Sequence, residues 1–137
     1  MKVIVTGGAG FIGSHVVDSL LAENIEVTVM DNFSTGRRQN LEHAKDSIEL
    51  VECDLGKHGE WVRHFKNADW VLHLAALADI VPSIQQPEAY FRANVDGTFN
   101  VLLAAKKAGV KRFIYTASSS CYGIPDYYPT SEDSEIR

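Results

Sequence analysis

Four glycines follow an apolar run close to the start of the chain, in the segment VIVTGGAGFIGSH. They stand at Gly7, Gly8, Gly10 and Gly13. Glycine loses more conformational freedom than other residues on ordering, so such a cluster indicates a tight turn or a close approach to the backbone. Residues 2–6 before it have the composition of a buried strand, and residues 11–24 after it have the spacing of an amphipathic helix. The chain must therefore place a strand, a glycine turn and a helix in direct succession.

Apolar segments of two kinds alternate along the rest of the chain. Short apolar runs predict five strands, at residues 2–6, 25–31, 48–54, 68–76 and 111–120. A second helical pattern covers residues 87–109 and ends on Lys106, Lys107 and Gly109, as helices often do. Strands separated by helices favour right-handed crossovers and a parallel sheet. We therefore predict one α/β domain over residues 1–137, with a doubly wound parallel sheet, no second domain and a final loop from Gly123.

Composition narrows the class of protein. The 137 residues are 45% hydrophobic and 23% charged, which suits one globular domain. The net charge of −5 argues against a nucleic-acid partner. Cys53 and Cys121 lack metal-ligand spacing, so no metal site is predicted. We predict a cytoplasmic protein without membrane contact. Its thiols are expected to be reduced, its first apolar run is too short for a signal peptide, and it has no membrane-spanning stretch.

The spacing Gly7-x-x-Gly10-x-x-Gly13 between a strand and a helix predicts a dinucleotide site. Gly7 permits the tight turn, Gly10 lets the backbone approach a pyrophosphate, and Gly13 lets the helix pack closely. The amino terminus of the helix then offers free N–H groups and partial positive charge to the phosphates. A plain tight turn is the alternative explanation of the glycines taken alone.

An acidic residue supports the dinucleotide interpretation. Asp31 ends the second predicted strand, 18 residues after Gly13, where a carboxylate accepts both hydroxyls of the adenosine ribose. The same charge repels a 2′-phosphate, so NAD is favoured over NADP. Arg37 and Arg38 weaken that preference without reversing it.

With these residues in place, the chain resembles the amino-terminal part of the extended short-chain dehydrogenase/reductase family. Within it, the chain is most similar to the NAD-dependent epimerase/dehydratase group, and there to UDP-glucose 4-epimerase-like enzymes. Six motifs carry the resemblance: VTGGAGFIGSH (5–15), DNFSTG (31–36), CDL (53–55), HLAAL (73–77), NVDGT (94–98) and ASSSCYG (117–123). The resemblance implies a Rossmann-like NAD-binding domain that stops before the substrate-binding part.

The resemblance also implies a set of NAD-binding residues. Phe11 and Ile12 contact the pyrophosphate through their N–H groups, and Asp54 and Leu55 contact the adenine. The adenosine is surrounded by Asp31, Asn32, Phe33, Ser34, Thr35 and Gly36. The path toward the nicotinamide ribose is lined by Leu74, Ala75, Ala76 and Leu77, with Asn94 facing the site.

The resemblance implies transient oxidation of a nucleotide sugar at carbon 4, followed by reduction on the other face of the sugar ring. A UDP-sugar is the substrate that it favours. Ser118 matches the active-site hydroxyl of the family, whereas capping of a strand end is its structural alternative. Ser119 and Ser120 follow it where dehydratases carry Asp-Glu, which favours epimerisation over dehydration.

One family motif is missing, and it leaves other functions open. No lysine follows a tyrosine by four positions, so the family's YxxxK is absent from these residues and the chain is expected to be inactive alone. A non-catalytic dinucleotide-binding module, or a dehydratase or reductase of the same family, are the alternatives. The resemblance further implies that a full-length protein forms a homodimer through two helices, one of them within residues 87–108.

Overall fold

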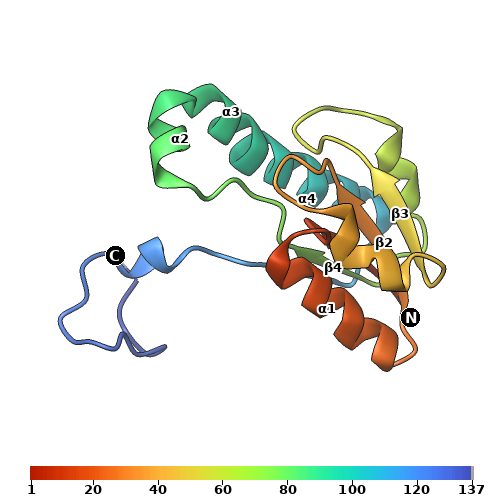
Figure 1. Cartoon of the computed structure of the whole chain (residues 1–137), viewed down its shortest axis with the longest axis horizontal. Coiled ribbons are helices and arrows are strands. Elements are labelled where there is room, and N and C mark those ends of the chain that lie inside the picture. Colours follow the sequence, from red (N-terminus) through yellow and green to blue (C-terminus); the bar gives the residue numbers. More distant parts are fainter. Residues whose placement is uncertain (137) are drawn as a thin grey trace.

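A five-stranded parallel sheet forms the centre of the molecule, with strand order β3-β2-β1-β4-β5 (Figure 1). The structure is a computed structural model that describes residues 1–136; Arg137, the last residue of the predicted domain, lies outside the described residues. The strands are β1 (Lys2–Thr6), β2 (Glu26–Asp31), β3 (Ile48–Glu52), β4 (Trp70–His73) and β5 (Arg112–Tyr115). This order and direction confirm the predicted Rossmann-like fold, and all five predicted strands are present, the last three shorter than expected.

Helices of three kinds connect the strands. The α-helices are α1 (Phe11–Ala22), α2 (Ile80–Gln85), α3 (Pro87–Phe91) and α4 (Gly97–Ala108). A π-helical turn at Arg92–Asp96 joins α3 to α4, so the helix predicted over residues 87–109 is present as a continuous helical run over 87–108 with a π turn in its middle. Short 3-10 helices lie at Arg38–Ala44, Glu60–Phe65 and Ser119–Tyr122. These 3-10 helices and α2 have no counterpart among the predicted elements.

The sheet is covered on both faces. Val3, Val5 and Val29 pack with Val17 of α1 and Leu41 of the first 3-10 helix on one face. The opposite face carries a second cluster, made by Ile4, Met30, Trp61, Phe65, Val71, Val101, Ala104 and Ala105 among others. β1 is buried on both sides because it lies in the middle of the sheet, which explains its unbroken β-branched sequence.

The apolar stripe of α1 is only partly buried. Val17 is fully buried, but Phe11 and Ile12 are 78% and 60% exposed. Both stand in the first turn of the helix, beyond the end of β1, where the sheet no longer covers them. The first turn therefore presents an open face at the carboxyl ends of the strands.

Two regions project from the sheet in Figure 1. Helices α2 and α3 form one of them, and the segment after β5 extends away from the sheet as the other. Large apolar side chains are exposed along α3, the π turn and α4, namely Phe91, Val95, Phe99 and Leu102.

We expect Gly13→Ala to destabilise the fold by about 1–3 kcal/mol through overpacking. A Cβ at Gly13 would lie 2.2 Å from the carbonyl oxygen of Gly7, and backbone must move to admit it. Gly97→Ala is the matched control, because its Cβ would meet nothing closer than 3.7 Å in a helix. The control is expected to hold or gain stability, by up to about 1 kcal/mol. Urea unfolding of both variants measures the difference, and equal midpoints would contradict the expectation.

Candidate functional site

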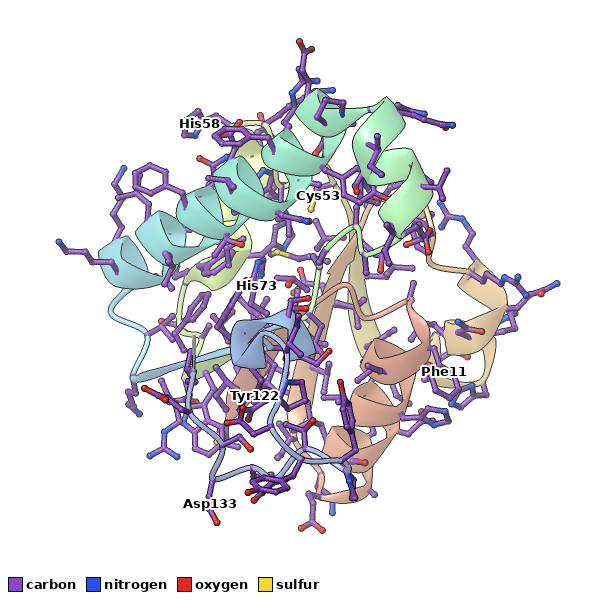
Figure 2. All side chains as sticks on the ribbon, turned by 90° about the vertical axis from the view of Figure 1, so that its left-hand side faces the viewer. Phe11, Cys53, His58, His73, Tyr122 and Asp133 are labelled. Atoms are coloured by element: carbon purple, nitrogen blue, oxygen red, sulfur yellow. The ribbon has the colours of Figure 1, made fainter. Side chains whose placement is uncertain are left out.

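A cavity of about 910 Å³ opens at the carboxyl ends of the strands. That volume is near the upper end of the ~300–1,000 Å³ typical of cofactor sites. The cavity lies at the edge of the sheet where parallel α/β proteins bind ligands. Figure 2 shows Phe11 at the start of α1 and His73 and Cys53 deeper in the molecule, all three of which line the cavity. Of the residues predicted to bind NAD or substrate, only Phe33 is not part of its wall.

The glycine turn brings α1 to the edge of this cavity. Gly7 has φ +69°, and a Cβ there would lie 2.7 Å from the backbone nitrogen of Ala75. The turn is closed by the N–H of Gly10, which donates to the carbonyl of Gly7 at 3.1 Å. Gly10 caps the helix without a side-chain hydrogen bond. The N–H groups of the first turn are therefore left for a ligand, as an anion requires.

Asp31 joins the turn to the end of β2. Its Oδ2 accepts the N–H of Ala9 at 2.9 Å, and its Oδ1 accepts the N–H of Phe33 at 2.8 Å. The side chain is 7% exposed and lines the cavity. Because each carboxylate oxygen accepts more than one hydrogen bond, these two donors leave acceptor positions for hydroxyl groups of a ligand.

The end of β3 supplies a second carboxylate. Asp54 Oδ1 accepts the N–H of Gly56 at 3.0 Å, and the carbonyl of Leu55 is held by Asn100 Nδ2 of α4 at 2.8 Å. Beside them, burial and then the charges of Asp31 and Asp54 raise the pKa of the Cys53 thiol to about 11. At neutral pH that thiol is protonated and a poor nucleophile.

A buried histidine links the two central strands to α4. His73 Nδ1 lies 2.7 Å from Thr6 Oγ1, and its Nε2 lies 3.0 Å from Thr98 Oγ1. Its ring stacks on Tyr115 with centroids 6.0 Å apart. Both ring nitrogens of His73 therefore have threonine partners, as a hydrogen-bonded structural histidine does. The two threonines were not singled out from the sequence, although the register of β1 with β4 pairs Thr6 with His73.

The π turn places Asn94 against the loop after β4. Asn94 Oδ1 accepts the N–H of Leu77 at 2.8 Å, and its Nδ2 donates to the carbonyl of the same residue at 2.9 Å. Thr98 Oγ1 donates to the carbonyl of Asn94 at 2.6 Å. The side chain of Asn94 therefore holds the loop after β4, which forms part of the cavity wall.

Ser118 lies at the other end of the cavity wall, after β5. It is exposed and caps the 3-10 helix Ser119–Tyr122, its Oγ accepting the N–H of Ser120 at 3.1 Å. Its Oγ also donates to Ser120 Oγ at 3.0 Å. The hydroxyl thus has a local structural role as a cap of this 3-10 helix, and the residue also lines the cavity. Arg92 and Asp79 also line the cavity, although sequence reasoning missed them.

Within residues 1–136, no three His, Cys, Asp or Glu side chains gather closely enough to hold a metal ion. No helix among these residues is both long and apolar enough to cross a bilayer.

Comparison with known proteins extends over the whole chain. The profile of the NAD dependent epimerase/dehydratase family matches residues 3–137. A UDP-glucose 4-epimerase of Mycolicibacterium smegmatis is 40% identical over 142 residues, covering 100% of this chain and 45% of that protein. UDP-glucuronic acid decarboxylase 1 of Danio rerio is 37% identical over 134 residues, covering 96% of this chain and 31% of that protein.

Solved structures give the same result. A UDP-glucose 4-epimerase from Stenotrophomonas maltophila, with bound NAD and formylated UDP-arabinopyranose, superposes with a TM-score of 0.89 at 29% identity, over 100% of this chain and 43% of that chain. The chain thus spans less than half the length of these relatives.

We expect stability to depend on pH through His73. Burial lowers its pKa from 6.5 to about 4, so between these values the unfolded chain binds the proton and the folded chain does not. The free energy of unfolding should therefore be fully present above pH 6.5 and decrease as the pH falls toward 4. The full loss is roughly 3 kcal/mol. Urea unfolding across this range measures it, with His73→Gln as the comparison; a variant with the same pH slope as the unaltered chain would contradict the assignment.

Proposed function

Because the chain belongs to the NAD dependent epimerase/dehydratase family, we propose that its 137 residues form the NAD-binding part of a nucleotide-sugar 4-epimerase. One observation carries the proposal. The uncapped first turn of α1 and the carboxylate of Asp31 face one cavity, so that a pyrophosphate and a ribose have their partners side by side.

The residues present fit NAD from end to end. The N–H groups of Phe11, Ile12 and Gly13 bind the pyrophosphate, and Asp31 accepts the ribose hydroxyls, with Asn32, Ser34, Thr35 and Gly36 around the adenosine. Asp54 and Leu55 hold the adenine. The loop Leu74–Leu77, fixed through Asn94, lies along the nicotinamide ribose. Bound NAD supplies a hydride acceptor for carbon 4 of the sugar.

The protein's own contribution to the reaction centres on Ser118. Ser118 lines the cavity, and its hydroxyl would exchange its hydrogen bond to Ser120 Oγ for one to the sugar hydroxyl that loses a proton. The next two residues are Ser119 and Ser120, which carry no acid group for the elimination of water. That chemistry favours epimerisation over dehydration. Without a Tyr-x-x-x-Lys pair, these residues bind the cofactor but are not expected to turn over substrate alone.

A decarboxylase is the second candidate within the family. The 37% identity to UDP-glucuronic acid decarboxylase 1 favours it about as strongly as the epimerase matches favour the first candidate. Both use NAD and a UDP-sugar by their family and names, so the two candidates share the proposed site. A non-catalytic dinucleotide-binding module shares it as well. Because these 137 residues are not expected to turn over substrate alone, the separating assay uses a protein of the relatives' full length that includes this chain. Incubation with NAD and either UDP-glucose or UDP-glucuronic acid then separates the candidates, by interconversion, by release of carbon dioxide or by neither.

We propose a homodimer and a cytoplasmic location for the protein. Phe91, Val95, Phe99 and Leu102 are exposed at spacings of three or four residues, which puts neighbours on one helix face and supports burial against a second copy. Cys53 and Cys121 are both free thiols, as is usual in the cytoplasm.

We expect saturable binding of NAD to this chain in calorimetric titration, with weaker binding of NADP. Asp31→Asn should weaken NAD binding about tenfold or more, because it removes a charged acceptor from the ribose. Asp46→Asn, which changes an exposed carboxylate that does not line the cavity, is the matched control and should leave the affinity unchanged. Thermal unfolding of Asp31→Asn shows whether the variant is folded, since its amide also changes the partner of the Ala9 N–H. A folded Asp31→Asn with full affinity would rule out the ribose role.

A further inference from the structure

The two arginines next to the proposed ribose site do not line the cavity. Arg37 and Arg38 follow the loop after β2 and are close enough in sequence to Asp31 to bind a 2′-phosphate. Neither of them lines the cavity. An arginine near this position is what lets a dinucleotide fold accept NADP. What holds Arg38 elsewhere therefore bears on coenzyme choice.

Two neighbours hold the guanidinium of Arg38. It forms an ion pair with the carboxylate of Glu52, at the end of β3. It also lies 4.1 Å from the centre of the Phe33 ring, as a cation over an aromatic face. The ring packs at the edge of the α1-side core and so offers a fixed platform.

Phe33 is itself fixed by the proposed ribose-binding residue. Its φ is +56°, in the left-handed region that bulky residues rarely adopt. The hydrogen bond from its N–H to Asp31 Oδ1 supports that backbone conformation, and the ring packs against the α1-side core rather than lining the cavity. This explains why Phe33 alone among the predicted residues is not on the cavity wall.

Glu52 closes the arrangement. Asp31 and Glu52 are paired in the register of β2 with β3, and paired residues of neighbouring strands point to the same face of a sheet. Three contacts therefore join Asp31 to Phe33, Phe33 to Arg38 and Arg38 to Glu52, and the strand register places Glu52 beside Asp31.

We propose that Glu52 is a positioning residue for coenzyme choice: it holds Arg38 on Phe33 and so denies a guanidinium to the 2′-phosphate of NADP. This inference rests on the proposed binding of NAD. With Arg38 held, the charged groups among the described cavity-lining residues are the carboxylates Asp31, Asp54 and Asp79 and the guanidinium of Arg92. Arg92 lies beside Gly56, near the adenine end rather than the loop after β2.

The holding interaction is one that a single substitution can release. The side chains of Arg38 and Glu52 are 58% and 60% exposed, so the ion pair is weak and water competes for both groups. Removing the charge of Glu52 frees the arginine to turn toward a phosphate, which binds a guanidinium more strongly than an aromatic face does.

The test compares the dissociation constants of NAD and NADP by calorimetry for the unaltered chain, Glu52→Gln, Arg38→Gln and the double variant. Glu52→Gln should lower the ratio of the NADP constant to the NAD constant about fivefold, since one exposed charge interaction is gained. The affinity for NAD itself should stay unchanged. The double variant should return the ratio to that of Arg38→Gln. Glu42→Gln, which removes an equally exposed ion pair with Lys45, is the matched control.

The outcomes separate this inference from the function on which it rests. An unchanged ratio in a Glu52→Gln chain that still binds NAD would overturn the role of Glu52 alone. A ratio lowered equally with and without Arg38 would also overturn it, because Glu52 would then act by direct repulsion. Failure of the unaltered chain to bind either dinucleotide would overturn both the inference and the proposed function.

Discussion

The rest of the structure depends on how closely α1 approaches the turn before it. The absence of a side chain at Gly13 lets the helix start directly on the carbonyl of Gly7. Ala9, between these two glycines, is completely buried, and its backbone is bonded to several neighbouring segments. Its N–H reaches Asp31, and its carbonyl accepts from the backbone of Arg37 at 3.0 Å and from the side chain of Asn40 at 2.8 Å. One close contact thus orders the helix terminus, the end of β2 and the loop that follows.

Features that depend on local pattern were predictable from the sequence. The strands follow from apolar runs, and the end of α4 follows from Gly109, whose φ of +72° is the left-handed cap expected of that residue. The glycine spacing identified the turn at one end of the cavity, and Asp31 was found because it ends the second predicted strand.

Features that depend on distant contacts were not predictable in the same way. The π turn at Arg92–Asp96 has a helical sequence, and its extra residue is understood only from the two bonds that Asn94 makes to Leu77. The partners of His73 come from β1 and α4, far apart in sequence. The left-handed backbone conformation of Phe33 is supported by its hydrogen bond to Asp31, and the residue type alone does not predict that conformation.

The parallel sheet also has a consequence for the speed of folding. None of its strand pairs is a hairpin, so each pairing needs a crossover to close first. β1 pairs with both β2 and β4, and its Thr6 meets a partner 67 residues away at His73. Chain entropy must be lost over those long loops before the central contacts form, which gives high contact order and slow folding. The pairing of β1 with β4, which brings the walls of the cavity together, is therefore expected to form late in folding.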